Sequence, residues 1–222
     1  MDYEAVMKLA LERGFYFPSC EVYADAQAGF WEYGPSGVSL KNKFLELWRR
    51  ELIRRDGMLE IDGSQIMSKS VFEASGHLGN FADPIIKCTK CNATFRADRT
   101  IAEITQIEIP ESADLEEFDK AISENNIKCP KCKGDFDKTK NFNMMFKVGI
   151  GPEEEEAYLR PETCQSIFVD FPRLYKTMRG KLPLGIAQVG KSFRNEIAPR
   201  QSLSLIHISE PTRRRLESRY PS

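Results

Sequence analysis

The chain has 222 residues, of which 41% are hydrophobic and 29% charged, a composition typical of a globular protein with a buried core. Its 32 basic and 33 acidic residues nearly cancel, which excludes a dominant positive field for coating nucleic acid but not a local basic patch. No apolar run reaches the roughly 18 residues of a membrane span, and the first residues are acidic where a signal peptide is basic. We therefore expect a cytoplasmic protein, with one large domain and a small insert.

The first third of the chain predicts two helices and a strand. Residues 3–13 have helical spacing, and Gly14 ends the helix. A second helix is expected from Pro35 to about Arg55, with an apolar stripe formed by Phe44, Leu45, Trp48 and Leu52. Residues 58–67 alternate as a strand does, and residues 68–83 are expected to form a loop and a short helix.

The remainder predicts an insert within a larger domain. Residues 87–137 begin and end with a Cys-x-x-Cys pair and are strongly acidic between them. Beyond them we expect a strand and turn at 142–151, an acidic loop at 153–156, a helix near 173–178 and an alternating strand at 185–193. The predicted division is therefore 1–86 and 138–201 for the main domain, 87–137 for the insert, and 202–222 for a tail.

The tail differs from the rest of the chain. Residues 203–213 read LSLIHISEPTR, which looks like the translation of a sequencing adapter, and the segment has no amphipathic period. We expect residues 202–222 to be non-native, and we assign no function to them. The alternative is a genuine but divergent C-terminal segment.

Four of the six cysteines predict a metal site. Cys88 and Cys91 form one Cys-x-x-Cys pair, and Cys129 and Cys132 form the second. In a cytosolic chain such pairs indicate metal ligands rather than disulfides, and four thiolates suit a closed, structural zinc site. The 37 intervening residues exceed the usual spacing of about 15–20, so four unliganded thiols are the alternative.

A phosphate-loop pattern occurs at residues 185–192, GIAQVGKS. That loop needs a strand before it and a helix after it, so that backbone amides converge on phosphate. Here the matching residues themselves alternate like a strand, and Pro199 interrupts the segment that follows. We therefore interpret residues 185–192 as a strand and not as a phosphate loop.

Two charged clusters are candidate ligand sites. In the sequence FRNEIAPR, Arg194 and Glu196 lie on one side of an extended segment, where the guanidinium can bind phosphate oxygens and the carboxylate can accept from an adenine amino group. A surface ion pair at the end of a hairpin is the alternative. In LRPET, Glu162 either binds a cationic ligand or forms an ion pair with Arg160.

Five blocks together resemble the class II glycyl-tRNA synthetases of the dimeric archaeal and eukaryotic type. In chain order they are GFWEYGPSGVSLKNKF, VFEASGHLGNFADP, CTKCNATFRAD, LRPETCQSIFVDF and FRNEIAPRQ. The resemblance covers residues 1–201, and the combination of blocks is highly specific. It implies an α+β fold, an antiparallel sheet with flanking helices, interrupted by a zinc-ribbon-like insert.

The resemblance also implies the site and the partners. Arg194 is the implied catalytic residue, on the α-phosphate of ATP, and Asn195 and Glu196 complete the ATP contacts. Glu162 is implied to take the glycine ammonium, and Arg96 to contact the same substrate. The implied cofactors and partners are Mg²⁺, structural Zn²⁺, tRNA-Gly and a second copy of the chain. The helix at 38–55 and the strand at 58–67 correspond to motif 1, which is implied to build the dimer interface.

The chain departs from the family pattern at a few positions. Ser68 replaces a usual proline, and Cys164 and Ser166 replace usual small residues of the pocket wall. The resemblance implies a motif 2 return strand, motif 3 and an anticodon-binding domain beyond residue 201, and we expect none of them in residues 202–222. We expect this fragment to be inactive alone, with Arg194 at an unpaired sheet edge. A non-catalytic paralogue and a zinc-ribbon RNA-binding protein are the alternative functions.

Overall fold

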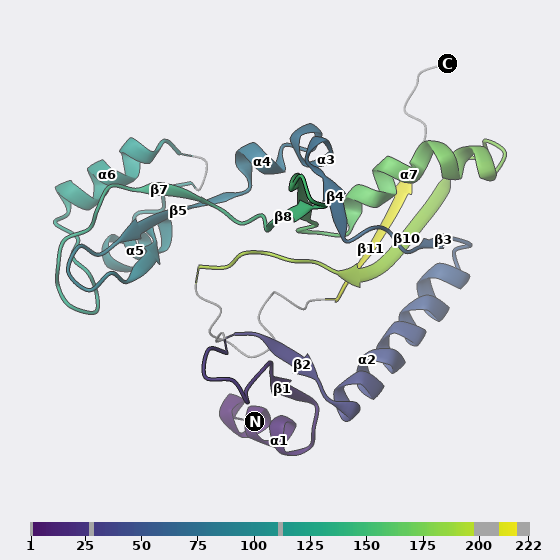
Figure 1. The fold of residues 1–222 in the computed structure, drawn as a ribbon, viewed down its shortest axis with the longest axis horizontal. Helices are drawn as coiled ribbons and strands as arrows, with labels where there is room; N and C mark the ends of the chain where they lie inside the picture. The colour runs from purple at the N-terminus through teal and green to yellow at the C-terminus, as the bar shows by residue number, and fades with distance from the viewer. Residues whose placement is uncertain (1, 27–28, 111–112, 198–208, 217–222) are drawn as a thin grey trace. The chain divides into compact units, whose positions relative to one another are not determined.

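The computed structural model describes residues 2–26, 29–110 and 113–197, together with the backbone of residues 209–216. The chain forms two compact units. Unit 1 consists of Met1–Val71, Phe146–Arg194 and Ala198–Ser222, and unit 2 of Phe72–Met145 and Asn195–Ile197. Figure 1 shows the course of the chain through both units.

Helices occur in both units. Those of unit 1 are α1 (Tyr3–Glu12), α2 (Pro35–Trp48), the π-helix η1 (Arg49–Arg54) and α7 (Cys164–Thr177). Helix α3 (Lys69–Ala74) crosses the boundary, and unit 2 contains α4 (His77–Asn80), α5 (Ala97–Thr105) and α6 (Leu115–Glu124). None of the helices in the described part of the chain is long and apolar enough to cross a membrane.

Most strand pairs are antiparallel. The described part of unit 1 contains three sheets. The first pairs β1 (Tyr16–Pro18) with β2 (Trp31–Tyr33), and the second has the strand order β11 (Ser209–Leu216), β10 (Leu184–Lys191), β3 (Leu59–Ile61). The third has the strand order β4 (Ile66–Ser68), β9 (Glu155–Leu159), β8 (Lys147–Ile150). Unit 2 contains the order β6 (Thr94–Arg96), β5 (Ala82–Lys87), β7 (Lys140–Asn143). Strands β3 and β10 pair in parallel, and every other strand pair among the described residues is antiparallel. The predicted α+β class is therefore confirmed.

The first two predicted helices are confirmed, with one change in packing. Pro35 opens α2 behind Gly34, and the helix continues as η1. Leu45 and Trp48 are buried, whereas Phe44 is 57% exposed, so the predicted apolar stripe does not lie wholly against the core. Leu40, Phe44 and Leu47 form a second, exposed stripe on α2 at the i, i+4, i+7 spacing.

The single strand predicted at 58–67 is wrong, because the segment breaks into β3 and β4, which belong to different sheets. The break contains Gly63, where an added Cβ would lie 2.2 Å from Ser166 Oγ and 2.9 Å from Gln188 Oε1. The chain therefore turns where only glycine fits against two buried side chains.

Strand β10 organises the core of unit 1. Leu184 and Ile186 pack with Ile167 of α7 on one face, and Ala187 on the other face packs with Trp48 and Ile53 of α2 and η1 (Figure 1). Because neighbouring side chains of a strand point to opposite faces, helices cover both sides of this strand. The predicted helix near residues 173–178 is the end of α7.

One edge of β10 pairs with β11 over the whole length from Leu184↔Leu216 to Lys191↔Ser209. The expectation of an unpaired edge is therefore wrong, because the backbone of residues 209–216 supplies the antiparallel neighbour. The other predictions for the tail, at 198–208 and 217–222, lie outside the described residues.

Unit 2 has a core of its own. Ile86, Ala97, Ile101, Phe118 and Ile127 are buried together, from β5, α5, α6 and the segment after α6.

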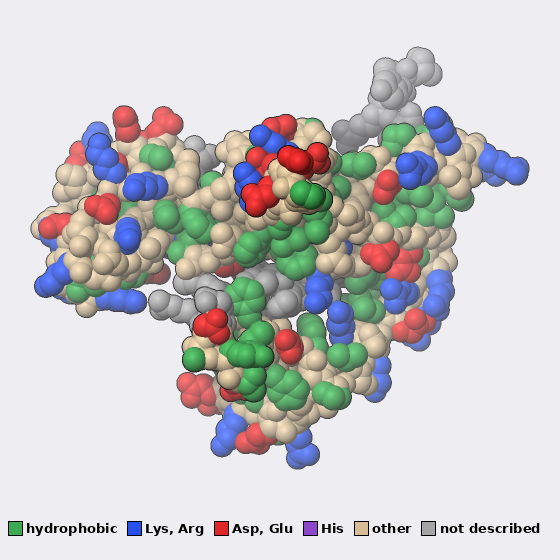
Figure 2. All heavy atoms as spheres, in the orientation of Figure 1, with side chains coloured by type: hydrophobic (Ala, Val, Ile, Leu, Met, Phe, Trp, Pro, Cys, Tyr) green, Lys and Arg blue, Asp and Glu red, His purple; other side chains and the backbone are tan. Residues whose placement is uncertain are grey.

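In unit 1, the acidic loop predicted at 153–156 corresponds to the β8–β9 turn and the start of β9, and Figure 2 shows its acidic side chains at the surface.

Candidate functional site

The four paired cysteines converge in unit 2. Their Sγ atoms all lie within 4.8 Å of one another, with 3.4 Å between Cys88 and Cys132 and 3.7 Å between Cys91 and Cys129. A tetrahedron with Zn–S distances of about 2.3 Å has sulfurs about 3.8 Å apart, so the thiols lie at the separation that zinc requires. Four thiols fill such a tetrahedron, and they fit a structural ion without an open position for a substrate.

The two Cys-x-x-Cys segments have the same backbone design. The N–H of each first cysteine donates to the carbonyl five residues later, Cys88 to Ala93 and Cys129 to Gly134, both at 2.9 Å. The carbonyl of each first cysteine accepts a hydrogen bond from the N–H four residues later. Those residues are Asn92 and Lys133, whose φ angles are 56° and 60°. Repetition of one turn in two segments 41 residues apart indicates two halves of one metal site.

Hydrogen bonds and burial shift the pKa values of two of these thiols in opposite directions. The backbone N–H of Cys91, more than the neighbouring thiols, lowers the pKa of Cys88 to about 6 against the effect of burial. The backbone N–H of Gly134 lowers the pKa of Cys132, but burial and the other three thiols outweigh it and raise that pKa to about 12. A divalent cation would allow all four to be thiolates.

Arg96, also in unit 2, is bound by two carboxylates. Its Nε and Nη2 donate to Asp98 at 3.0 and 2.7 Å, and its Nη1 lies 3.1 Å from Asp83 Oδ1. Burial raises the pKa of Asp98, but the hydrogen bond from Arg96 and the nearby positive charges outweigh it and lower that pKa. Arg96 thus joins β6 to β5 and to the first turn of α5.

The LRPET segment is the turn between β9 and α7 in unit 1. Glu162 Oε1 accepts from Cys164 Sγ at 2.8 Å and from Gln165 Nε2 at 2.6 Å, so two residues of the first turn of α7 hold this carboxylate. Glu162 is half-buried, whereas its neighbours Pro161 and Thr163 are fully buried. The turn therefore presents one carboxylate from an otherwise buried segment.

Arg160 anchors that turn from inside the protein. Its side chain is fully buried, its Nε donates to Lys191 O at 2.9 Å, and its Nη1 donates to Gly63 O at 2.9 Å and Gln188 Oε1 at 3.3 Å. Gln188 Oε1 also accepts from Gly63 N at 3.1 Å, and its Nε2 donates to Thr163 O. We call the set Gly63, Arg160, Thr163, Gln188 and Lys191 the arginine hub.

Arg194 is attached to the same turn. The Phe193 N–H donates to Arg160 O at 2.9 Å, and Arg194 Nε donates to Pro161 O at 3.1 Å. Two consecutive residues after β10 thereby bond to the two residues before Glu162. The structure thus brings Arg194 and Glu162, separated by 32 positions in the sequence, onto one hydrogen-bonded framework.

Residues 192 and 193 do not continue the strand that the sequence predicts over 185–193. Strand β10 ends at Lys191 because the next amides bond elsewhere: Phe193 N to Arg160 O, and Asn195 N to Met144 O at 2.8 Å. Asn195 and Glu196 belong to unit 2, as do Arg96 and the four cysteines, whereas Glu162 and Arg194 belong to unit 1.

The phosphate-loop pattern at 185–192 is a strand, as the sequence context predicts. Residues 184–191 are β10, and both glycines of the pattern are explained by packing. An added Cβ at Gly185 would lie 2.7 Å from Met58 Cγ, and one at Gly190 would lie 1.8 Å from Arg160 Nη2. The glycines therefore give room to Met58 and Arg160 rather than to a phosphate.

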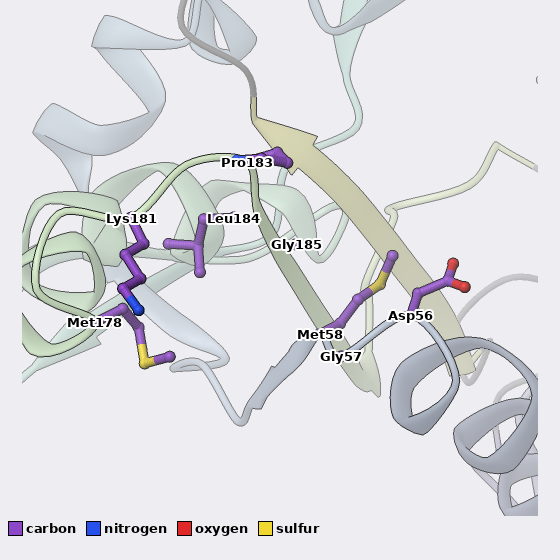
Figure 3. Close-up of a pocket in the computed structure, with 8 residues that line it drawn as sticks. All are labelled: Asp56, Gly57, Met58, Met178, Lys181, Pro183, Leu184 and Gly185. Atoms are coloured by element: carbon purple, nitrogen blue, oxygen red, sulfur yellow. The ribbon is translucent and has the colours of Figure 1, made fainter.

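A cavity of about 380 Å³ opens near the start of β10 (Figure 3). It is lined by Asp56, Gly57, Met58, Met178, Lys181, Pro183, Leu184 and Gly185. None of the residues predicted to bind glycine, ATP or metal lines it, so it has no part in the candidate site.

Sequence reasoning missed the residues that hold the turn. Gly63, Gln165 and Gln188 were not singled out, because each acts through residues far away in the sequence or through a neighbouring side chain. Gln188 gives a local signal, because a polar side chain among the apolar residues of a strand indicates a buried amide that is hydrogen-bonded to other buried groups.

Comparison with known proteins gives several relatives of one kind. Glycine–tRNA ligase from Methanothrix thermoacetophila is 45% identical over 202 residues, and the match covers 90% of this chain and 34% of that protein. The proteins of the same name from Methanocaldococcus jannaschii and Aeropyrum pernix are each 44% identical, over 216 and 204 residues. No protein-family model matches the chain.

The chain spans about a third of the length of the curated relatives it matches. Among solved structures, the crystal structure of the RNA binding domain of threonyl-tRNA synthetase from Cryptosporidium parvum Iowa II matches with a TM-score of 0.50 and 18% identity. That match covers 94% of this chain and 34% of the other. The resemblance to glycyl-tRNA synthetases and the synthetase-type α+β fold are therefore confirmed.

Proposed function

We propose that this chain is part of a glycine–tRNA ligase, an enzyme that activates glycine with ATP and transfers it to tRNA-Gly. The observation that carries the proposal is the 45% identity to a glycine–tRNA ligase along 90% of the chain. The hydrogen-bonded framework that joins Glu162 to Arg194 supports it, because the reaction needs a group for an ammonium and a group for a phosphate near one another.

In this proposal Glu162 takes the glycine ammonium and Arg194 grips the α-phosphate of ATP. A carboxylate and a guanidinium form charge-assisted hydrogen bonds with these partners. Arg194 is the catalytic residue, since it would stabilise the negative charge that develops at phosphorus. Its Nε is bound to Pro161 O, and this contact orients the guanidinium before the substrate arrives.

Three residues of unit 2 complete the proposed contacts. Asn195 and Glu196 are assigned to ATP, and Arg96 to the glycine substrate. Asp83 and Asp98 already form ion pairs with the guanidinium of Arg96. These two carboxylates largely neutralise the charge of Arg96, so we propose that Arg96 orients the glycine substrate rather than attracting it strongly.

The reaction proceeds in two displacements. The glycine carboxylate oxygen attacks the α-phosphorus, the bond to the bridging oxygen breaks, and pyrophosphate leaves with glycyl-adenylate remaining. The terminal ribose hydroxyl of the tRNA then attacks the glycyl carbonyl, losing its proton, and AMP leaves. Mg²⁺ bound with ATP supplies charge neutralisation for the pyrophosphate. Positioning and charge account for such a reaction without a strong general base.

Zinc, a second copy of the chain and a cytoplasmic location complete the proposal. Cys88, Cys91, Cys129 and Cys132 would hold Zn²⁺, whose role is to stabilise unit 2. The exposed stripe of Leu40, Phe44 and Leu47 on α2 is the proposed homodimer face. Six free cysteines agree with a reducing compartment such as the cytoplasm.

The test is glycine-dependent ATP–pyrophosphate exchange with the protein encoded by the complete gene. Exchange is expected, and Arg194→Ala should lower kcat/KM by more than about tenfold, or about 1.4 kcal/mol of barrier. Glu162→Gln should raise the KM for glycine more than that for ATP. Arg173→Ala, an exposed arginine on α7, is the matched control and should change neither.

Two outcomes would contradict the proposal. Exchange that survives within tenfold in Arg194→Ala would remove its catalytic role, and no exchange at all by the complete protein would favour the non-catalytic paralogue. We expect no exchange from the 222-residue chain alone, which contains about a third of the length of its relatives.

A further inference from the structure

Gln165 is a buried amide beside the proposed ammonium-binding carboxylate. It lies in the first turn of α7, is 5% exposed, and donates its Nε2 proton to Glu162 Oε1 at 2.6 Å. One end of the amide is therefore used to hold Glu162.

The other end of this amide has no partner in the part of the chain that the structure describes. Within the described residues, Gln165 Oε1 is fully buried and accepts no hydrogen bond. Leaving a buried acceptor unsatisfied costs about 1–3 kcal/mol, and such atoms in native proteins usually mark a missing donor. A ligand with an N–H group is the kind of partner that would satisfy it.

The separation of the two acceptor oxygens is short enough for one ammonium to bridge them. The oxygen and nitrogen of an amide are about 2.3 Å apart, and Nε2 lies 2.6 Å from Glu162 Oε1. The two oxygens are therefore no more than about 5 Å apart, whereas a nitrogen at about 2.8 Å from each acceptor can bridge a separation of up to about 5.6 Å.

We propose that Gln165 is a specificity-determining residue, whose Oε1 accepts a second hydrogen bond from the substrate ammonium held by Glu162. The inference rests on the proposed glycine–tRNA ligase function and deepens it. An alkylammonium carries three donors and can bond both oxygens, whereas a neutral hydroxyl of the same size carries one. Gln165 therefore favours the amine of glycine over the hydroxyl of an isosteric hydroxy acid.

The experiment uses the complete protein with Gln165→Met, which keeps the side-chain volume and removes both polar atoms. The KM for glycine in pyrophosphate exchange should rise about 10–100-fold, as for loss of a hydrogen bond to a charged group. The KM for ATP and the melting temperature should stay close to those of the parent. Gln65→Met, at an exposed glutamine, is the matched control.

Glycolate as a competitive inhibitor separates recognition of the ammonium from a structural effect. If Gln165 contacts the ammonium, Gln165→Met should weaken glycine and leave the weaker binding of glycolate nearly unchanged. Equal weakening of both ligands, or an unchanged KM for glycine, would overturn the inference. If Gln165→Met fails to fold, Gln165→Asn keeps an amide but withdraws Oε1, and it should also raise the KM for glycine.

The two proposals fail in different ways. Exchange by the parent with an unchanged glycine KM in the Gln165 variants refutes the inference and leaves the proposed function standing. Absence of glycine-dependent exchange in the parent refutes the function and the inference together.

Discussion

Replacing Gly190 by alanine tests the arginine hub directly. An added Cβ would lie 1.8 Å from Arg160 Nη2 and 3.0 Å from its Cζ, so the buried guanidinium must move. Its bonds to Lys191 O and Gly63 O, both at 2.9 Å, would then break. Hydrogen bonds from a charged group contribute about 1.5–3 kcal/mol each, so their loss costs about 3–6 kcal/mol.

A second effect of the substitution acts in the opposite direction. Alanine reduces the entropy of the unfolded chain, which returns about 0.5–1 kcal/mol. The expected net loss in the free energy of unfolding is therefore about 2–5 kcal/mol. Gly149→Ala, in β8 of the same unit, is the matched control, because its nearest contact would be an ordinary 3.4 Å to Glu154 Cβ. This control should change stability by less than about 1 kcal/mol.

The assay is urea unfolding followed by tryptophan fluorescence. Both tryptophans of the chain, Trp31 and Trp48, belong to unit 1, so the signal reports the unit that contains the hub. A loss below about 1 kcal/mol in Gly190→Ala would refute the packing explanation. A normal stability combined with weakened ATP binding would instead favour the phosphate-loop interpretation of this segment.

Three further predictions concern the metal, the carboxylates and the dimer face. The purified protein should contain about one zinc per chain, and Cys132→Ser should lose most of it by elemental analysis, whereas Cys20→Ser, at an exposed cysteine, should not. Asp98→Asn should destabilise unit 2 by about 1–3 kcal/mol at pH 7 in metal-release assays. Folding lowers the pKa of Asp98, so the stabilisation that its carboxylate contributes is present above about pH 4 and is lost as the pH falls further. Phe44→Glu should shift the complete protein from dimer to monomer in analytical ultracentrifugation without loss of folding, whereas Asn42→Glu, also exposed on α2, should not.

The sequence predicted the features that depend on neighbours along the chain. Helices α1 and α2 follow from spacing, Gly14 and Pro35, and the convergence of the thiols follows from the two Cys-x-x-Cys pairs. The strand character of residues 184–191 also followed from local alternation, against a complete match to a phosphate-binding pattern. The helices and the strand depend on interactions within a few residues, whereas the metal site brings together two such local pairs that lie far apart in the sequence.

The errors arose where distant residues decide the local structure. Residues 58–67 break at Gly63 because Ser166 and Gln188 occupy the space beside it, and nothing near Gly63 indicates this. Strand β10 ends at Lys191, before the predicted limit, because the carbonyl of Arg160 takes the amide of Phe193. An alternating pattern predicts which residues can pair in a sheet, but not whether another segment captures their amides first.

The hub also predicts how far loss of the metal reaches. Gly63 and Arg160 are bonded across 97 positions, and most of that interval is unit 2, which has its own core and thiol cluster. If Cys132→Ser unfolds unit 2, the contact between Gly63 and Arg160 closes a flexible loop that includes the unfolded residues. This loop is about four times as long as the unit 1 residues between Gly63 and Arg160 alone. Each doubling of loop length costs about 0.6 kcal/mol. The free energy of unfolding of unit 1, followed by tryptophan fluorescence, should therefore fall by only about 1 kcal/mol. Because the hub residues all belong to unit 1, their hydrogen bonds survive this change. Simultaneous unfolding of both units on metal loss would contradict the argument, since it would require stabilisation of the hub by unit 2 beyond the cost of loop closure.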